Sequence, residues 1–277
     1  MKLAFMSSTC PNFTVDEVIV LAKKLGCEGF EPRVGWGHSN GIEVSSPPER
    51  VQALGRQLAD AGIAIPCIAS SVRTAVLPGQ ARQEQLDEVK RMVDLAILAG
   101  APNIRVFGQG EKEWDEATRM AHAIDTLSEA ALIAAGSGVT LCLETHDNFR
   151  AGRMVGHVVD AVNRPEVQVL WDITHAVMVG EKVPDTAKYI KLDRVKHCHV
   201  RDLFLTRAEN GVLTAEQCLD FGKGDAAAYV GEAAKMLSQS GYTGYFSLEV
   251  IFKPSDTSHD ATKFLTTAVQ GMRSVIL

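Results

Sequence analysis

Residues 138–175 read GVTLCLETHDNFRAGRMVGHVVDAVNRPEVQVLWDITH, with two short apolar runs separated by a longer amphipathic stretch. The runs, residues 139–144 and 167–172, are apolar on both faces, which is typical of strands buried on both sides of a parallel sheet. The stretch between them is predicted to be a helix. We therefore interpret this segment as a strand, a helix and a second strand, the repeating unit of an α/β protein.

The same alternation extends over the rest of the chain. Six further runs of this kind lie at residues 3–7, 29–33, 64–69, 103–107, 195–200 and 245–251. Eight strands alternating with about eight helices predict a closed parallel barrel, the (β/α)8 TIM barrel. The chain shows no domain boundary, repeat or low-complexity linker, so we expect one domain over residues 1–277.

The intervals between the runs carry the usual marks of helix ends. Thr14 precedes the first helix and has Glu17 three residues later, which is a capping-box pattern. The Pro-Pro pair at 47–48 opens the second helix, where proline is tolerated in the first turn. Gly100 and Gly136 each follow an apolar stripe with helical spacing, as expected of helix C-caps.

An open doubly wound sheet is the alternative fold. That fold usually has a glycine-rich turn after its first strand, which cradles a phosphate. Residues 7–12 read SSTCPN and contain no glycine, which favours the barrel. The longest irregular stretch is expected at residues 202–225, after the seventh strand, and a long loop at that position in a barrel usually belongs to the active-site face.

The composition argues against several classes of protein. The formal net charge is −6, with 28 Lys and Arg residues and no long basic run, so no nucleic-acid partner is expected. The six cysteines form no CxxC pair, which argues against zinc-ribbon and thioredoxin-like sites and favours buried free thiols. The apolar part of the N-terminus is too short for a signal peptide, and no run approaches the ~20 residues that span a bilayer. We therefore expect a soluble, cytoplasmic protein without a membrane partner.

Acidic residues and histidines fall at the ends of the last four predicted strands. The fifth strand ends in Glu144, and the sixth ends in Asp172 with His175 just beyond it. The seventh carries His199 near its end, and the eighth carries Glu249. The carboxyl ends of barrel strands form the face on which TIM-barrel enzymes do their chemistry, so these side chains are the first candidates for a site.

The seventh strand offers two histidines, and strand geometry chooses between them. Side chains alternate along a strand, so His197, His199 and Arg201 share one face while Lys196 and Cys198 share the other. Arg201 then lies nearest solvent and His197 one layer deeper. We therefore predict His199 as a metal ligand, and His197 as a supporting or core residue.

Three carboxylates and an imidazole at one barrel mouth require compensation, because like charges a few ångströms apart raise pKa values or bind a cation. A glutamate alone could equally be a salt-bridge partner, and a single histidine in an apolar strand could be a hydrogen-bonded core residue. Four such residues on four consecutive strand ends favour one divalent ion, bound by Glu144, Asp172, His199 and Glu249. Oxygen-rich ligation with one histidine favours Mn²⁺, Mg²⁺ or Co²⁺, with Zn²⁺ and Fe²⁺ also compatible.

The motifs LETH, WDITH, HCHVRD and SLEV, with the opening MKLAF and the second strand GFEPR, resemble the xylose isomerase-like TIM barrel superfamily of sugar isomerases and epimerases. In its epimerase and hydroxypyruvate isomerase branches, a Glu, an Asp, a His and a Glu from strands five to eight bind one metal ion. The resemblance implies that Glu144, Asp172, His199 and Glu249 do so here. It also implies that His175 contacts the substrate.

The resemblance further implies a metal-dependent isomerase or epimerase that acts on a small sugar or keto-sugar. The metal would chelate a carbonyl and the adjacent hydroxyl, which acidifies the neighbouring C–H. Glu144 and Glu249 would act as the catalytic pair, one removing the proton to give an enediolate and the other returning a proton. Homodimers and tetramers are common in the family, and a homo-oligomer is expected here by that analogy only.

Other residues are candidates for substrate binding. Arg33 ends the second strand and His38 follows in the loop GWGHSNG, where either could bind a hydroxyl or carboxylate, or have only a surface role. Lys223 lies in the turn FGKGD, which could contact substrate or simply close the loop. Arg201 could hold a carboxylate or phosphate, and Trp36 could wall the pocket.

Four other functions share parts of this pattern. An endonuclease IV-like nuclease needs histidines on the third and fourth strands, where this sequence has IASSVR and RVFGQG. True xylose isomerase uses two metals and a denser acidic cluster. A non-catalytic sugar sensor would not need both Glu144 and Glu249. A dehydratase of a keto-polyol, such as an inosose or dehydroshikimate, remains open, because it begins with the same proton abstraction and then expels hydroxide.

Overall fold

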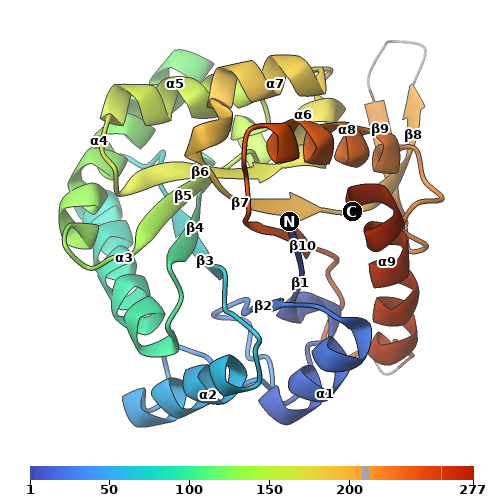
Figure 1. The fold of residues 1–277 in the computed structure, drawn as a ribbon. Helices are drawn as coiled ribbons and strands as arrows, with labels where there is room; N and C mark the ends of the chain where they lie inside the picture. The colour runs from blue at the N-terminus through green and yellow to red at the C-terminus, as the bar shows by residue number, and fades with distance from the viewer. Residues whose placement is uncertain (208–212, 257) are drawn as a thin grey trace.

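The computed structural model describes residues 1–207, 213–256 and 258–277. Eight parallel strands form one curved sheet in the order β2-β1-β10-β7-β6-β5-β4-β3 (Figure 1). The ring is completed between its two ends by parallel bridges from Gly29 to Ala64 and from Arg33 to Ala69. The strands are β1 (Lys2–Met6), β2 (Gly29–Glu31), β3 (Ile68–Arg73), β4 (Asn103–Phe107), β5 (Thr140–Glu144), β6 (Val167–Asp172), β7 (Val195–Val200) and β10 (Tyr245–Leu248). The predicted TIM barrel is therefore confirmed.

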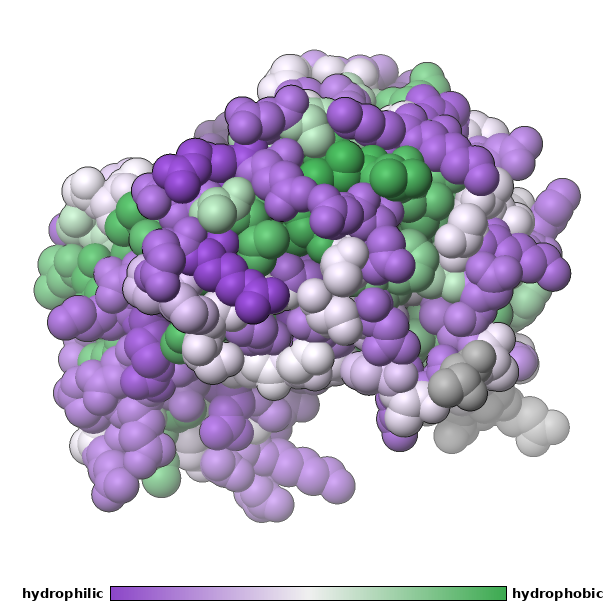
Figure 2. All heavy atoms as spheres, turned by 90° about the horizontal axis from the view of Figure 1, so that it is seen from below, coloured by the Kyte–Doolittle hydropathy of each residue, from purple (hydrophilic) through white to green (hydrophobic). Residues whose placement is uncertain are grey.

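Helices cover the outside of the barrel (Figure 1). They are α1 (Val15–Leu25), α2 (Pro48–Asp60), α3 (Gln80–Ala99), α4 (Glu116–Ala134), α5 (Gly152–Val162), α6 (Ile173–Met178), α7 (Val183–Ile190), α8 (Ala226–Gln239) and α9 (Ala261–Ile276). Short 3-10 turns follow β1 and β5 and precede β7, at Ser7–Thr9, Asp147–Phe149 and Leu192–Arg194. Hydrophilic residues cover most of the face seen in Figure 2, with hydrophobic residues gathered between them. The helices thus bury their apolar stripes against the sheet and present polar faces to water.

The predicted helix ends at Thr14, Pro48 and Gly100 are confirmed, whereas the C-cap of α4 is Ala135 instead of Gly136. The Thr14 hydroxyl accepts a hydrogen bond from the Glu17 backbone N–H, and the Glu17 carboxylate accepts one from the Thr14 backbone N–H at 2.8 Å. Pro48 occupies the first turn of α2. Gly100 caps α3 in the left-handed region, with φ of 74°, and Gly136 has the same φ just after α4. Local sequence therefore sets where these helices begin and end.

Several boundaries differ from the sequence prediction. The second strand ends at Glu31 instead of residue 33, and the eighth ends at Leu248 instead of residue 251, so Arg33 and Glu249 lie just beyond the strands that were predicted to contain them. The third strand begins at Ile68 instead of residue 64, since Pro66 lacks the backbone N–H that regular pairing needs. The stretch after β7, predicted to be irregular, contains an antiparallel hairpin of β8 (Asp202–Arg207) and β9 (Leu213–Cys218). The expectation of an irregular stretch was therefore wrong for these residues. The two strands pair with each other, from Asp202 with Cys218 to Arg207 with Leu213, and so satisfy each other's backbone hydrogen bonds.

The core lies on both sides of the barrel wall and includes all six cysteines, which are free and buried, as predicted. Burial raises the pKa of the Cys10 and Cys27 thiols to about 12, because the charged thiolate is poorly solvated there. Among the described residues, no helix is long and apolar enough to cross a bilayer.

Candidate metal centre

The four side chains predicted as metal ligands come together at one mouth of the barrel. Glu144, Asp172, His199 and Glu249 each contribute a potential ligand atom, and these atoms lie within 4.8 Å of one another. All four side chains are buried. A cluster of three carboxylates and one imidazole at the carboxyl ends of parallel strands is the arrangement that the sequence predicted.

Strand register explains why these residues converge. Asp172 at the end of β6 pairs directly with His199 on β7. Glu144 is the last residue of β5 and pairs with Leu170 of β6. Glu249 follows β10, and its backbone N–H donates to the Val200 carbonyl of β7 at 3.0 Å. Neighbouring strands of a parallel sheet thus end side by side and present these side chains to one point.

His199 is bonded at both ring nitrogens. Its Nδ1 lies 2.8 Å from Glu144 Oε1 and 3.7 Å from Glu249 Oε2, whereas its Nε2 lies 2.9 Å from Glu31 Oε1. Burial lowers the pKa of the imidazole, but the attraction of Glu31, Glu249 and Glu144 outweighs it and holds the pKa well above its usual value. In this arrangement Nδ1 is the nitrogen that faces the carboxylate cluster.

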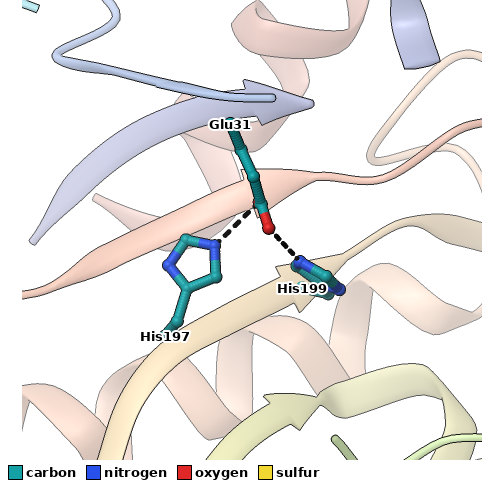
Figure 3. A group of neighbouring side chains, drawn as sticks. All are labelled: Glu31, His197 and His199. Atoms are coloured by element: carbon teal, nitrogen blue, oxygen red, sulfur yellow. Dashed lines mark hydrogen bonds and ion pairs between the residues drawn. The ribbon is translucent and has the colours of Figure 1, made fainter. Parts of the chain in front are cut away.

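Glu31, at the end of β2, supports both histidines of β7 (Figure 3). Its Oε2 lies 2.8 Å from His197 Nε2, and its Oε1 contacts His199. Burial would raise the pKa of this carboxyl, but His199 and His197 hold it well below its usual value. The three side chains form a second group of potential ligands, buried beside the first. Sequence reasoning missed Glu31, although an acid inside the apolar run GFE could have pointed to it.

Two arginines neutralise the acids of the cluster. Arg105, on β4, donates from Nη1 to Glu249 Oε1 at 3.2 Å, and its Nε lies 3.5 Å from Glu144 Oε2. Arg201 Nη2 donates to Asp172 Oδ2 and, at 2.9 Å, to Glu249 Oε2. Despite burial, His199 and Arg105 lower the pKa of Glu144 to about 2, and Arg201 is the strongest of the groups that lower the pKa of Asp172. Sequence reasoning missed Arg105, a charged residue in the otherwise apolar run NIRVF.

Asp172 has a structural role as well as its place in the cluster. Its Oδ1 accepts hydrogen bonds from the Thr174 and His175 backbone N–H groups at 2.9 and 3.1 Å, and from the Thr174 hydroxyl at 2.6 Å. The carboxylate therefore caps α6 through Oδ1 while Oδ2 faces Arg201. The cap joins Asp172 to the two residues that lie two and three positions after it in the WDITH motif, Thr174 and His175.

The predicted substrate-binding residues have different surroundings. His175 is buried, its ring centroid lies 4.5 Å from that of His146, and burial lowers its pKa to about 4. Arg33 lines a cavity of about 680 Å³ that Glu249 and His146 also line. Arg201, proposed to hold a substrate anion, is instead paired with the carboxylates of the cluster. Lys223 is exposed and is not among the residues that line this cavity.

The donor set fits one divalent cation. Three carboxylates and one imidazole present their atoms within a span suited to a single ion, and Glu144 Oε2 is buried without a hydrogen-bond partner among the described residues. A bound ion would have to displace the Nη2 of Arg201 from Asp172 and Glu249, and His199 would have to be deprotonated at Nδ1 to act as a ligand. Metal binding is therefore expected to compete with Arg201 and with protons.

Comparisons with known proteins agree with the fold. The sequence profile of the xylose isomerase-like TIM barrel family matches residues 19–268, and the chain belongs to this family. Similar solved structures include the IolI protein with a bound zinc atom, with a TM-score of 0.79 and 20% identity over 100% of this chain and 98% of that one. D-psicose 3-epimerase with D-fructose has a TM-score of 0.76 and 16% identity, covering 100% of this chain and 99% of that one.

The probable 3-DHS dehydratase AsbF from Bacillus anthracis is also similar, with a TM-score of 0.74 and 14% identity over 99% of both chains. No curated protein matches this sequence. At these identities the solved structures establish the shared barrel.

Proposed function

We propose that this protein is a divalent-metal-dependent isomerase or epimerase of a small sugar or keto-sugar. The observation that carries the proposal is the buried cluster of Glu144, Asp172, His199 and Glu249, which combines a metal-type donor set with two candidate acid/base carboxylates. A bound divalent ion would polarise a substrate carbonyl and so acidify the neighbouring C–H.

Side chains of the protein would then transfer the proton. Glu144 and Glu249 come from β5 and from the end of β10, on either side of β6 and β7. Its low pKa keeps Glu144 ionised at neutral pH, which is the form that a proton acceptor or a metal ligand requires. Arg105 contacts both carboxylates and can offset the charge that changes as the proton moves from one to the other. We assign the proton-accepting and proton-donating steps to this pair.

The structural neighbours support this class of reaction, since they include a zinc-binding IolI protein and a D-psicose 3-epimerase. The neighbours also include the probable dehydratase AsbF, so a keto-polyol dehydratase is the second candidate function. His146 favours that candidate. It lines the cavity, and although burial lowers its pKa, the contact with Asp147 at 3.0 Å and the charge of Glu144 raise the pKa overall. A protonated imidazole there would be suited to protonate a departing hydroxyl.

Deuterium exchange tests the proposal. The Mn²⁺-loaded protein is incubated in D₂O with ketoses, inososes and hydroxypyruvate, and the products are analysed by NMR and mass spectrometry. Incorporation of deuterium at carbon without loss of water is expected, and Glu144→Gln or Glu249→Gln should abolish it. Loss of water would identify a dehydratase instead. Failure of every compound to exchange would argue for a binding protein without catalysis.

A further inference from the structure

Arg33 is a buried cation without a carboxylate partner among the described residues. Its side chain is 6% exposed, and its hydrogen bonds all go to neutral groups. Arg105 and Arg201, the other two arginines near the centre, are each paired with carboxylates. A buried charge normally has a counter-ion, so the charge of Arg33 needs one from elsewhere.

The guanidinium of Arg33 is held in a fixed orientation. Its Nη1 donates to the Val34 and Ala69 carbonyls, both at 2.9 Å, and its Nη2 donates to Ser71 Oγ at 2.6 Å. The Trp36 ring lies 4.4 Å from the guanidinium carbon. These contacts use three of the five N–H groups, which leaves Nε–H and one Nη2–H. Ser71 accepts through its oxygen, so its own O–H is available to donate.

A second donor lies on the same loop. The Arg33 backbone N–H donates to Ser7 Oγ at 2.7 Å, and Ser7 Oγ lies 2.8 Å from His38 Nδ1. If the Ser7 hydroxyl donates to Nδ1, the proton of the neutral ring lies on His38 Nε2. That nitrogen is buried and has no hydrogen-bond partner among the described residues.

The free edge of Arg33 belongs to the cavity of the proposed metal centre. Arg33, Ser71 and Trp36 line that cavity together with Glu249 of the ligand cluster. Burial, and then the repulsion of Arg105, lower the pKa of Arg33 to about 9 in spite of the attraction of Glu249, Glu144 and Glu31, so its charge is only partly compensated. A ligand that extends from the metal centre along the cavity would contact the guanidinium of Arg33, which is fixed in orientation and whose charge is only partly compensated.

We propose that Arg33 and Ser71 form a subsite for a carboxylate, so that the substrate is a sugar acid instead of a neutral sugar. This inference rests on the proposed function of the same site. Two N–H groups of one planar guanidinium match the two oxygens of a carboxylate. The cavity lining contains four arginines and four acidic residues, so one added negative charge is better accommodated than the two of a phosphate ester.

A matched set of ligands tests the subsite by binding alone. D-fructuronate, D-fructose and D-fructose 6-phosphate differ only at carbon 6, and each is titrated by calorimetry into the Mn²⁺-loaded protein. We expect D-fructuronate to bind about tenfold or more tightly than D-fructose, since hydrogen bonds to charged groups are the stronger ones. Arg33→Gln should remove this preference, and Arg33→Lys should keep part of it.

The matched control is Arg91→Gln. Arg91 lines the same cavity but is exposed and paired with Glu88, so its removal should leave the preference unchanged. Circular dichroism and metal content verify that each variant is folded. If Arg33→Gln does not fold, the comparison is made with Arg33→Lys. Three results would each overturn the inference. They are equal or undetectable binding of the three ligands, a preference for the phosphate, and a preference for the carboxylate that survives in Arg33→Gln.

The binding test of the subsite and the deuterium-exchange test of the proposed function can fail independently. An Arg33-dependent preference for the carboxylate, with no deuterium exchange in any compound, would support the subsite and contradict the isomerase. Exchange of neutral ketoses with no carboxylate preference would do the opposite.

Discussion

At the scale of single residues, the two histidines of β7 have different environments although both contact Glu31. His199 reaches the carboxylate cluster through Nδ1, whereas His197 bonds only to Glu31 and its Nδ1 has no partner among the described residues. Alternation along the strand puts both on one face, and depth in the barrel separates their roles.

His199→Ala should weaken Mn²⁺ binding by more than ~100-fold. His197→Ala should weaken it by less than ~10-fold, because groups bonded directly to a ligand typically contribute ~10–100-fold and His197 reaches His199 only through Glu31. His197→Ala should instead lower the free energy of unfolding by about 1–3 kcal/mol, since Glu31 loses a buried partner. Calorimetric metal titration and thermal unfolding measure the two effects. The reverse pattern would show that His197 is the ligand.

His38 gives a pH-dependent prediction. Burial, and then the charge of Arg33, lower its pKa from 6.5 to about 4. As the pH falls from 6.5 to about 4, the unfolded chain takes up a proton at this residue and the folded protein does not. The contribution of His38 to the free energy of unfolding therefore falls with pH across this window and is fully present above pH 6.5. Denaturant titrations of metal-free wild type and His38→Gln at several pH values should show a flatter dependence in the variant; parallel curves would refute the assignment.

At the scale of secondary-structure elements, close helix contacts depend on glycine. A Cβ built on Gly156 of α5 would lie 2.2 Å from the Tyr189 carbonyl oxygen of α7. On Gly231 of α8, the nearest atom would be the Val275 carbonyl oxygen at 3.4 Å, an ordinary contact. Helix α5 can therefore approach α7 only because residue 156 has no side chain.

Gly156→Ala should lower the free energy of unfolding by about 1–3 kcal/mol, the usual cost of overpacking. Gly231→Ala is the matched control, and it should be neutral or stabilising by up to about 1 kcal/mol, because alanine favours a helix over glycine. Urea denaturation of both variants measures the difference. Equal effects at the two positions would contradict the close approach of α5 and α7.

The loop after β8 and β9 is also organised at this scale. Asp202 Oδ2 accepts from the Gly222 and Gly224 backbone N–H groups at 2.8 and 2.7 Å, and Oδ1 accepts from Leu203 and Ala227, both at 2.9 Å. A carboxylate with four such bonds is committed to holding the loop. This explains why Asp202 belongs to neither group of potential ligands found among the described residues.

At the scale of the whole molecule, the proposed centre joins strands that are far apart in the sequence. The carboxylates of Glu144, Asp172 and Glu249 crowd together, and Arg105, Arg201 and the imidazole of His199 pair with them. A cation that binds the folded state and not the unfolded chain should therefore stabilise the entire barrel.

Mn²⁺ at about 100 times its Kd is expected to raise the free energy of unfolding by about 2.7 kcal/mol, and EDTA should reverse the change. Differential scanning calorimetry measures the shift in Tm. In the double variant Glu144→Gln/Glu249→Gln the shift should largely disappear. A Tm that does not respond to any of Mn²⁺, Mg²⁺, Co²⁺, Zn²⁺ or Fe²⁺ would argue against a metal centre.

The sequence by itself determined the alternation of strands and helices, the helix caps at Thr14 and Gly100, and the set of residues at the strand ends. These features depend on interactions within a few residues: side-chain alternation, capping and the periodicity of apolar positions. They were sufficient to predict the barrel and to bring the four candidate ligands to the same mouth.

Only the tertiary structure decided what surrounds those residues. Glu31 meets His197 across 166 positions of sequence, and Arg105 meets Glu249 across 144. These contacts arise because closing the barrel brings β2 opposite β7, and β4 opposite the end of β10, which no local pattern encodes. The same closure leaves Arg33 buried among neutral groups, and a missing partner can be recognised only once every neighbour is in place.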